Sequence, residues 1–473
     1  MTQEALVAEL DGLRNVALKP YSSYAPSPVP WLDDVPSEWS AIRLDRLFRY
    51  RNEEPLETDG RVTGYLDGRV TLRSNVAYQK IKGVVYETGW QRIHVGDFAI
   101  SGMNAHLGGM GVSDSEGKCS PIYLILEPLP RTNARFVSLA VRHAAHLGAI
   151  KALVQTIRFN SADMKRADLK SIYVPVPSIA EQEQIVRFVR HLDSKVNRLI
   201  KAKRRLIELL NEQKQAIIHQ AVTRGLDPTV SLKPSGLPWC PMIPAHWSVV
   251  PNSMMVRPKK RLVGERHSEF TLLSLTRQGV IVRDLSENKG KFSKDLGTSQ
   301  EVREGDLVFC LFDIPETPRT VGKSSHYGMI TSAYSVFEPN NQLQAAFLEA
   351  FYIAMDDRKL LSPLYSGLRN TIAPSRFLSV KTPMPQDNEV APIMEQIRSG
   401  LAEVGRILEV ATKEIDLIRE YRTRLVADVV TGQLDVRHID LPEVDGQLEA
   451  LVDDTGLEDD PEETDDSLEE VEP

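Results

Sequence analysis

The feature that most constrains the fold of this chain is an internal duplication with a period of about 200 residues. When the sequence is shifted by 208 positions, short segments of its first half fall on matching segments of its second half. The matching pairs are Trp31 with Trp239, Val35–Ser40 with Ile243–Ser248, Pro175–Pro177 with Pro383–Pro385, Val222–Thr223 with Val430–Thr431, and Leu226–Asp227 with Leu434–Asp435. Solenoid repeats are far shorter, so the pattern predicts a tandem duplication with pseudo-two-fold symmetry.

The first part of each copy has the mixed pattern of a compact α+β domain. Ser120–Leu126 and Gly305–Leu311 are rich in β-forming residues and follow turn signals, which predicts buried strands. Short helices are expected at Phe136–Leu147 and Gln344–Leu361. Between the anchors the offset drifts by one to three residues, so that Gly96-Asp97 pairs with Gly305-Asp306.

The second part of each copy predicts one long helix. Residues 180–223 contain neither Pro nor Gly, and their apolar positions from Ile185 to Ile217, including Leu206, are spaced by three, four or seven residues. That spacing is a coiled-coil seam, and about 44 residues at ~1.5 Å each give a rod of roughly 65 Å. Ser178 is a candidate N-cap, with Glu181 completing a capping box. A lone amphipathic helix leaves its apolar face in water, so the two helices are expected to pair as an antiparallel coiled coil.

These patterns divide the chain into six segments. They are an N-terminal helix and linker at 1–34, a first globular domain at 35–177, a central long helix at 178–226, a second globular domain at 227–385, a C-terminal long helix at 386–437 and an acidic tail at 438–473. Asp387–Pro392 differs from the corresponding start of the first helix, so the first residue of the second helix is left open within this stretch.

The charge of the chain is unevenly distributed. Residues 438–473 contain sixteen of the 65 acidic residues and no Lys or Arg, so the remainder has 57 basic against 49 acidic residues. A tail of this composition is expected to be disordered. It is either a solubilising segment or a DNA mimic that competes for the basic body. A moderately basic body is compatible with nucleic-acid binding.

Several functional classes lack their sequence signals. The three cysteines are isolated, which fits a reducing cytoplasm and predicts neither a disulfide framework nor a zinc site. The apolar runs are too short for a membrane span, and the first ten residues do not have the pattern of a signal peptide. The stretch Gly111–Cys119 misses the phosphate-loop spacing, and no adenine-methyltransferase motif, nucleophile elbow or metal-ligand cluster is present. The sequence therefore predicts a binding protein without catalytic or metal-ligating residues.

The repeated motifs resemble the specificity subunits of type I restriction-modification systems. Tyr173–Val186 is similar to that family's proline-bracketed strand followed by a Glu-Gln helix, and the two Pro-x-x-Trp openings, Pro36/Trp39 and Pro244/Trp247, are similar to its repeat starts. Gly367–Arg369 and the endings Val222–Asp227 and Val430–Asp435 also fit. The resemblance covers about residues 20–437, and it is carried by the joint order of the motifs rather than by any single one.

The resemblance implies a role in phage defence as a non-catalytic subunit of a methyltransferase and endonuclease complex. Each globular domain would be a target-recognition domain that reads one half of a bipartite, asymmetric site in double-stranded DNA. The coiled coil would set the spacing of the half-sites and dock two methyltransferase (modification) subunits, which methylate adenine. S-adenosylmethionine would be bound by those partners, and ATP and Mg²⁺ by a separate motor-nuclease (restriction) subunit, so this chain needs no cofactor of its own.

Candidate DNA-binding residues follow from the chemistry of DNA recognition. Arg, Lys, Asn and Gln reach base edges, and Lys and Arg contact phosphates. In the first domain they are Arg69, Arg73, Lys80, Lys82, Arg92, Asn104, His106, Arg158 and Asn160. In the second they are Lys259, Lys260, Arg261, Arg277, Lys289, Lys291, Lys323, Arg369 and Asn370. For any single cation, a solvated surface position is the alternative. Ile200 and Ile207 are candidates for an exposed apolar docking face on the first helix.

Two other functions stay open on the sequence alone. The duplicated domains could bind proteins, with the helices as a scaffold. The chain could also be an unrecognised nuclease or a fused enzyme. Salt-dependent retention on heparin would separate a DNA reader from an adaptor, and metal-dependent DNA cleavage by the purified chain would indicate a nuclease.

Overall fold

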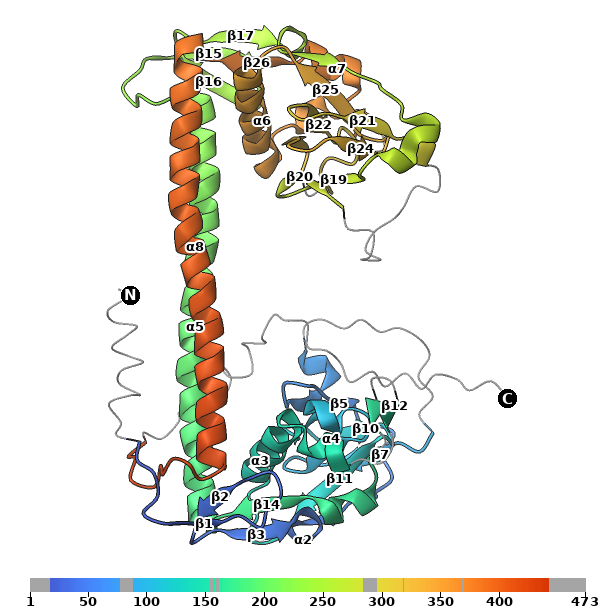
Figure 1. Ribbon diagram of the computed structural model, residues 1–473, viewed down its shortest axis with the longest axis vertical. Helices are drawn as coiled ribbons and strands as arrows, with labels where there is room; N and C mark the ends of the chain where they lie inside the picture. Colours follow the sequence, from blue (N-terminus) through green and yellow to red (C-terminus); the bar gives the residue numbers. More distant parts are fainter. Residues whose placement is uncertain are drawn as a thin grey trace. The chain divides into compact units, whose positions relative to one another are not determined.

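The chain forms two compact units, each built from segments that are distant in sequence. The computed structural model describes residues 18–76, 88–153, 157–158, 161–162, 164–283, 296–317, 319–367 and 370–441. The first unit joins the chain up to Arg204 with the segment from Lys413 onward, and the second comprises Arg205–Thr412. Each unit contains one globular body and a stretch of both long helices (Figure 1).

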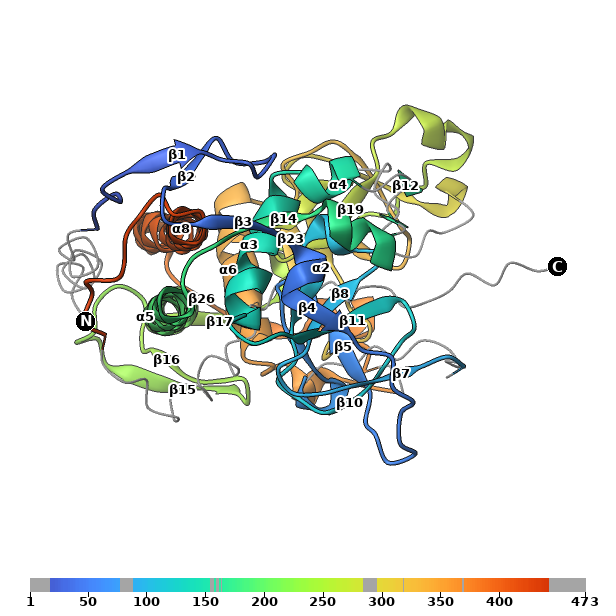
Figure 2. The same cartoon turned by 90° about the horizontal axis from the view of Figure 1, so that it is seen from below.

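The two long helices predicted from the sequence are present and pair antiparallel within each unit. Helix α5 spans Ile179–Arg224 and helix α8 spans Asp387–Val430. In the first unit Asp193 of α5 pairs with Arg422 of α8, and Lys203 further along α5 pairs with Glu414, which is earlier on α8. In the second unit Gly400 lies against Ile217. Figure 2 shows the two helices as adjacent coils.

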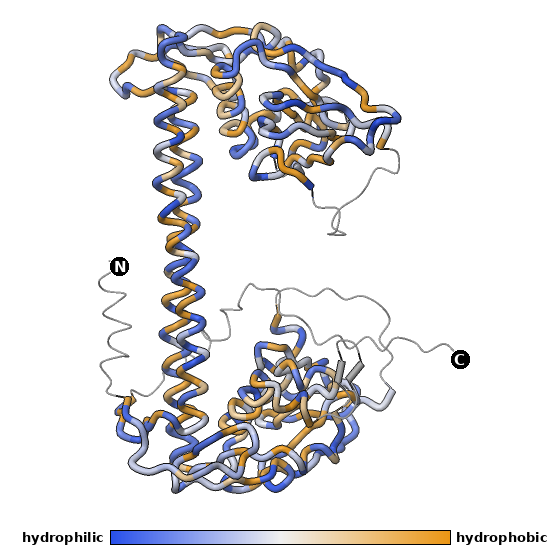
Figure 3. The backbone as a smooth tube through the Cα atoms, viewed as in Figure 1, coloured by the Kyte–Doolittle hydropathy of each residue, from blue (hydrophilic) through white to orange (hydrophobic). Residues whose placement is uncertain are grey.

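The seam between the helices is mainly apolar, and the Asp193–Arg422 and Lys203–Glu414 ion pairs also join the two helices. Both helices alternate apolar and polar residues along their length (Figure 3), and burying the apolar stripe stabilises the pair. The buried seam residues on α5 include Ile185, Val189, Leu192, Val196, Leu199 and Leu210. The predicted seam residue Leu206 is instead 39% exposed. The heptad passes through Lys203, which forms an ion pair with Glu414, so the apolar stripe is interrupted just before Leu206.

The starts of the two helices use different capping contacts. Ser178 accepts a hydrogen bond from the Glu181 amide at 3.4 Å, as expected of an N-cap, but the Glu181 carboxylate does not complete the predicted capping box. It binds Tyr21 and Trp39 instead. Helix α8 begins at Asp387, where Glu389 reaches back to accept a hydrogen bond from the Gln386 amide at 3.1 Å.

The first globular body is built around a four-stranded antiparallel sheet with strand order β4-β11-β8-β9. Its strands are β4 (Phe48–Tyr50), β11 (Tyr123–Pro128), β8 (Phe98–Ser101) and β9 (Met110–Val112). Helix α3 (Ala134–His146) packs against β9 and buries Phe136, Val137 and Val141. Its start is fixed by Asn133, whose side chain accepts hydrogen bonds from two amides of the first turn.

Shorter elements complete the first body. Its two-stranded sheets are β14 (Tyr173–Val176) with β3 (Ser40–Arg43), β10 (Gly117–Cys119) with β7 (Gln91–Ile93), β5 (Val62–Gly64) with β6 (Val70–Leu72), β12 (Ile157–Arg158) with β13 (Ser161–Ala162), and β1 (Tyr24–Pro26) with β2 (Asp34–Pro36). Its short helices are α2 (Leu44–Leu47), α4 (Ala149–Leu153), η1 (Arg73–Asn75), η2 (Ala105–Leu107) and η3 (Arg166–Ser171).

The second globular body repeats the same sheet, with strand order β18-β25-β22-β23. These strands are β18 (Val256–Pro258), β25 (Ser335–Pro339), β22 (Leu307–Phe309) and β23 (Val321–Lys323). The pairs are β17 (Ser248–Pro251) with β26 (Lys381–Met384), β21 (Gln300–Val302) with β24 (Gly328–Ile330), β19 (Leu273–Thr276) with β20 (Gly279–Val282), and β15 (Leu232–Leu237) with β16 (Cys240–Pro244). The helices are α6 (Gln342–Asp357), α7 (Pro374–Ser379), η4 (Asn252–Met254), η5 (Gly264–Glu269), η6 (Leu296–Thr298) and η7 (Ser362–Leu364). The duplication and the mixed α+β class predicted from the sequence are confirmed.

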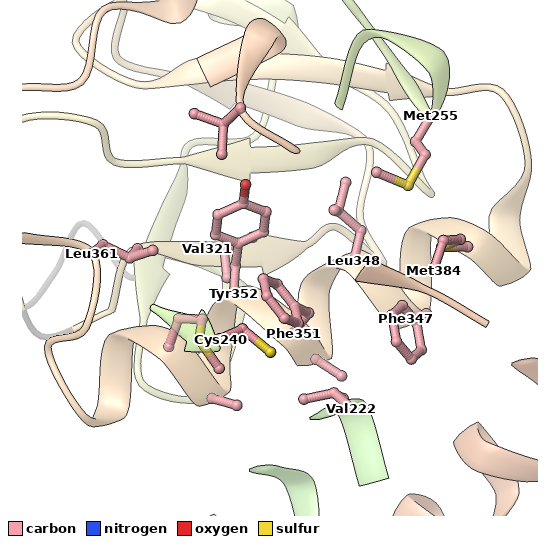
Figure 4. Packing of buried hydrophobic residues seen from close by; sticks show 14 of the residues in the cluster. Val222, Cys240, Met255, Val321, Phe347, Leu348, Phe351, Tyr352, Leu361 and Met384 are labelled. Carbon is pink, nitrogen blue, oxygen red and sulfur yellow. The ribbon is translucent and has the colours of Figure 1, made fainter. Parts of the chain in front are cut away.

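The core of the second unit joins the sheet, α6 and the end of α5. Phe347, Phe351 and Tyr352 of α6 point into a cluster that also contains Val222 of α5 (Figure 4). Tyr352 is fully buried, and its hydroxyl accepts a hydrogen bond from the Asn252 amide nitrogen at 2.6 Å. Burial raises the pKa of Tyr352 to about 12, so the phenol stays protonated.

Each long helix ends on the tryptophan of a Pro-x-x-Trp motif. Gly225, just after α5, lies against Trp247, and Gly432, just after α8, lies against Trp39. Both glycines have positive φ, which ends a helix at little steric cost. Helix α8 therefore stops at Val430, before the predicted bound of 437, because the chain turns at Gly432.

The two predicted terminal features fall largely outside the described residues. Residues 1–17 of the segment predicted as an N-terminal helix and linker, 1–34, lie outside the described residues, and the described part contributes β1 and the start of β2. The acidic tail from residue 442 also lies outside the described residues. The described segment 431–441 packs beside α5, where the Gln184 side chain donates hydrogen bonds to the carbonyls of Val436 and Ile439.

Candidate nucleic-acid interface

The predicted DNA-binding residues lie on both globular bodies. Lys80, Lys82, Asn160, Lys289, Lys291 and Arg369 lie outside the described residues. The backbone of Arg158 belongs to β12, which pairs with β13. The other eleven are placed by the structure as follows.

Two arginines of the first body are positioned by the hairpin β5–β6. The Arg69 guanidinium donates to Asp67 at 2.6 Å and lies over the Tyr65 ring at 5.3 Å. Arg73 donates to the Thr63 hydroxyl at 2.8 Å. Both side chains are half-buried, and these contacts hold each guanidinium in one place. A restrained arginine loses less conformational entropy when it meets a phosphate or a base edge.

Arg92 of β7 lies among three carboxylates. Its guanidinium is 3.4 Å from Asp59, 3.5 Å from Glu53 and 3.9 Å from Glu116. Only 19% of the side chain is exposed. The local charge is therefore negative rather than positive. Among Arg69, Arg73 and Arg92, the predicted cations of the first body whose side chains the structure describes, Arg92 has the surroundings least suited to a phosphate.

Asn104 and His106 lie in the turn between β8 and β9, at the 3-10 helix η2. Asn104 precedes η2 and Gly108 follows it with φ of +85°, which ends the turn. Burial, and secondarily the charge of Lys151, lower the pKa of His106. His106 is therefore neutral near pH 7 and can act as an uncharged donor and acceptor.

In the second body, the basic run at 259–261 is only partly available. Lys259 is 2.6 Å from Glu338, and Arg261 is 3.2 Å from Asp306 and 3.4 Å from Glu338. The Lys259 ammonium lowers the pKa of the Glu338 carboxyl. Lys260 is exposed between them. Of these three cations, Lys260 is the one best placed to contact a phosphate.

Three further predicted residues of the second body lie on turns or at a cavity. Arg277 is exposed at the turn of hairpin β19–β20. Lys323 of β23 lines a cavity of about 620 Å³, and its amide donates to Glu349 at 2.6 Å. Asn370 is exposed with φ of +44°, in a turn where the Thr371 amide donates to Ser366. Asn tolerates this left-handed conformation better than most residues.

The sequence did not reveal an arginine-carboxylate cluster that occurs in both bodies. Arg51 pairs with Asp97 at 2.9 Å and with Glu127 at 3.5 Å. Arg261 makes the equivalent contacts to Asp306 and Glu338. The duplication had already aligned Asp97 with Asp306, since each follows a turn glycine, and the structure places Glu127 and Glu338 at the ends of equivalent strands. These partners tie Arg261 to the body, which weakens the case for it as a phosphate ligand.

A contact between a buried and an exposed aromatic ring on the second body was also missed, since Phe270 is buried and Tyr327 is exposed. Tyr327 is 58% exposed, and its ring lies 5.5 Å from that of Phe270. The Arg266 guanidinium lies 5.8 Å from the Phe270 ring. Aromatic and arginine faces of this kind can stack on unpaired bases. The sequence signal was weak, because Tyr327 lies 57 residues from Phe270.

Among the described residues, no group of three or more His, Cys, Asp or Glu could hold a metal ion. All three cysteines are free and buried. No helix in the described part of the chain is long and apolar enough to span a bilayer.

Comparisons with known proteins place the chain beside one family. No model of a known protein family matches the chain. Two proteins of Methanocaldococcus jannaschii match the chain. The first, named as the MjaX type I restriction enzyme specificity subunit, is 20% identical over 432 residues. The match covers 86% of this chain and 96% of that protein. The MjaVIII type I restriction enzyme specificity subunit is 22% identical over 438 residues, covering 86% of this chain and 95% of that protein.

A solved structure shares the fold of this chain. A chain from a solved structure described as showing complex assembly and conformational transition of the type I R-M system superposes with a TM-score of 0.60. It is 12% identical, and the match covers 85% of this chain and 99% of that one. The two α+β bodies and the paired helices are thus a known arrangement. The resemblance predicted from the motifs is confirmed: the chain is similar, over nearly its whole length, to the specificity subunits of type I restriction-modification systems.

Proposed function

We propose that this chain is the DNA-specificity subunit of a type I restriction-modification complex and carries no catalytic site of its own. Each globular body reads one half of a bipartite DNA site. The observation that carries the proposal is that the bodies share one sheet order, β4-β11-β8-β9 and β18-β25-β22-β23, but present different side chains. Two copies of one reader with unlike surfaces suit an asymmetric target. The names of the relatives support the same role.

The long helices set the distance between the half-sites in this proposal. A helix of 46 residues is about 69 Å long at ~1.5 Å per residue. Half-sites read from one side of B-DNA lie about 34 Å apart, or a multiple of that distance. Continuous helices have the length required for such a spacer.

The helices also offer apolar surface for the modification subunits. The prediction that Ile200 lies on an exposed docking face is wrong, because its side chain is only 5% exposed within the first unit. Other apolar side chains on the helices are exposed: Leu206, Leu209, Ile407 and Val410 in the second unit and Leu417 in the first. In this proposal the modification subunits cover these side chains. S-adenosylmethionine, ATP and Mg²⁺ are then bound by the partner subunits, and the complex acts in the cytoplasm.

Selection from a random pool of duplex DNA tests the proposal. The chain is purified together with the modification subunit encoded beside it, and bound duplexes are sequenced at a stated salt concentration. Enrichment of a single motif with two unlike halves and a fixed spacer is expected. If the complex is intact but enriches no motif and is not retained on heparin, the chain is a protein-binding adaptor rather than a DNA reader.

A further inference from the structure

Two turns of the first body carry residues that were predicted to contact DNA. The hairpin turn, Tyr65–Arg69, connects β5 with β6 and contains Arg69. The η2 turn, Asn104–Gly108, lies between β8 and β9 and contains Asn104 and His106. The two turns are well separated in sequence, so contacts in the fold must fix where they lie relative to each other.

The hairpin turn rests directly on the sheet of the first body. The Tyr65 amide donates a hydrogen bond to the Arg69 carbonyl at 2.8 Å, and the Gly68 amide donates to the Tyr65 carbonyl at 3.0 Å. A side chain at Gly111 of β9 would collide with the Gly68 carbonyl oxygen. The backbone of the turn therefore lies against β9, which is the edge strand of the sheet.

Arg142 of α3 holds the hairpin turn from the side. Its guanidinium donates a hydrogen bond to the Leu66 carbonyl at 2.9 Å. It also fills the space that a side chain at Gly68 would need. A guanidinium is planar and donates in fixed directions, so it restrains a backbone carbonyl more closely than a flexible ammonium does.

The same arginine lies beside the η2 turn. A Cβ built on Gly108 would lie 3.9 Å from Nε of Arg142 and 3.4 Å from a ring carbon of His146, and both side chains come from α3. Within this turn the Asn104 carbonyl accepts hydrogen bonds from the amides of Leu107 at 3.0 Å and Gly109 at 2.9 Å. Arg142 is thus placed against both turns.

Arg142 is also close to the ion pair that joins the two long helices of this unit. That pair is formed by Asp193 of α5 and Arg422 of α8 at 2.8 Å. Burial, and secondarily repulsion by Arg422, lower the pKa of Arg142 to about 10. Arg142 therefore remains protonated at pH 7 and keeps all of its hydrogen-bond donors.

Stability alone is a poor reason to place an arginine here. Replacing a buried charged group by an apolar side chain of similar volume is often neutral or stabilising. An apolar side chain could fill the space beside Gly68, but it could not donate to the Leu66 carbonyl. The arginine is suited to fixing the position of a backbone turn.

We propose that Arg142 is a positioning residue for DNA recognition. It fixes the hairpin turn and the η2 turn relative to each other, so that Arg69, Asn104 and His106 address one half-site together. This inference rests on the DNA-reading function proposed above. Base contacts specify the sequence and phosphate contacts set the orientation, so displaced turns should cost base preference rather than all affinity.

Hydrogen exchange in the full-length chain tests the positioning step without DNA. In Arg142→Gln the amides of both turns, Gly68 and Gly109 among them, should exchange about tenfold faster than in the wild type. Amides at the start of α3, such as Val137, should be unchanged, because Asn133 caps that end of the helix. Unchanged exchange in either turn would contradict the proposal.

Selection from a pool of duplex DNA tests the recognition step. In complexes with the modification subunit, Arg142→Gln should reduce base preference by about tenfold in one half of the motif and leave the other half unaltered. Arg142→Lys retains the charge but not the planar fork and should show the same change to a smaller degree, which keeps the test available if Arg142→Gln does not fold.

A destabilised variant separates positioning from stability. Ile185→Ala removes a fully buried side chain from the seam of α5 in the same unit, and it should lower the melting temperature without relaxing either half of the motif. An equal relaxation in Ile185→Ala would show that Arg142 acts only through stability, and would overturn the proposal.

The outcomes distinguish this inference from the function on which it rests. If the wild type enriches no motif, the DNA-reading function fails and the role of Arg142 in recognition falls with it. If the wild type enriches a motif and Arg142→Gln retains full preference in both halves, only the role of Arg142 is contradicted.

Discussion

The indole nitrogen of Trp39 donates a hydrogen bond to the carboxylate of Glu181 at 3.1 Å. The same carboxylate accepts a second hydrogen bond from the Tyr21 hydroxyl at 2.6 Å. The N-terminal segment that contains Tyr21 and Trp39 thus meets the first turn of α5, more than 140 residues later in the sequence. Glu181 is 6% exposed, so the carboxylate depends on these two donors in place of water.

Replacing Glu181 by Ala should destabilise the first unit by about 3 kcal/mol, because two buried donors lose their acceptor. Urea unfolding followed by circular dichroism measures the change. Glu183→Ala is the control: Glu183 is exposed on the same turn and should change the free energy of unfolding by less than about 0.5 kcal/mol. Equal effects of the two substitutions would show that the Trp39–Glu181–Tyr21 contacts contribute nothing specific.

Gly68 is expected to tolerate no side chain. Its φ is +96°, and a Cβ would lie 1.7 Å from a terminal nitrogen of Arg142. Gly68→Ala should therefore lower the free energy of unfolding by about 2–3 kcal/mol, through backbone strain and displacement of Arg142. Gly148 has φ of +78° but nothing within 4 Å of its Cβ, so Gly148→Ala should cost only about 1 kcal/mol of strain. Equal losses in thermal or urea unfolding would contradict the role of the Arg142 contact.

The first unit should lose stability as the pH falls below neutrality. In the folded state, burial and secondarily the charge of His146 lower the pKa of His143. In the unfolded chain the pKa of a histidine is about 6.5. Between those two values the unfolded chain binds more protons, so the free energy of unfolding decreases as pH falls.

The contribution of His143 is measured as a difference in slope. Urea unfolding is followed from pH 7 to pH 5 in the wild type and in His143→Gln. The free energy of unfolding should depend less steeply on pH in the variant. Identical slopes would show that His143 does not contribute to the pH dependence.

Substitution of Arg277 tests whether the second body contacts DNA. It is exposed at a hairpin turn, a position from which its guanidinium can reach a base edge or a phosphate. Arg277→Ala should weaken binding of the selected duplex by about tenfold and, if Arg277 contacts a base, relax only one half of the motif. Arg376→Ala is the control, because Arg376 is exposed on α7 of the same unit and is not among the predicted contacts. A change in both halves of the motif would contradict separate reading by the two bodies.

The predictable parts of the fold were those with a sequence pattern within one half of the duplication or a match between its two halves. The heptad spacing identified the long helices, β-forming runs after turn signals located β11 and β22, and the duplication predicted that the second body repeats the first. Leu206 was misplaced because periodicity alone cannot show that the seam is interrupted by the Lys203–Glu414 pair.

The candidate site was less predictable because its contacts are long-range. Arg261 is a plausible phosphate ligand by composition, but Asp306, 45 residues away, engages it in the fold. Glu181 looked like half of a capping box, but its partners are 142 and 160 residues away. One cavity of the first unit is lined by arginines from three helices and a hairpin, and no sequence window contains them together: Arg69, Arg135, Arg142, Arg190, Arg419 and Arg422.

The most direct measurement is a map of methylated adenines in a host that lacks adenine methylation. This chain is expressed with the neighbouring modification subunit, and the genome is sequenced by a method that detects N6-methyladenine. We predict one bipartite motif with unlike halves and a fixed spacer, which disappears when this chain is omitted. Methylation that is unchanged without this chain, or a motif that is palindromic, would contradict its role as a reader with two different recognition bodies.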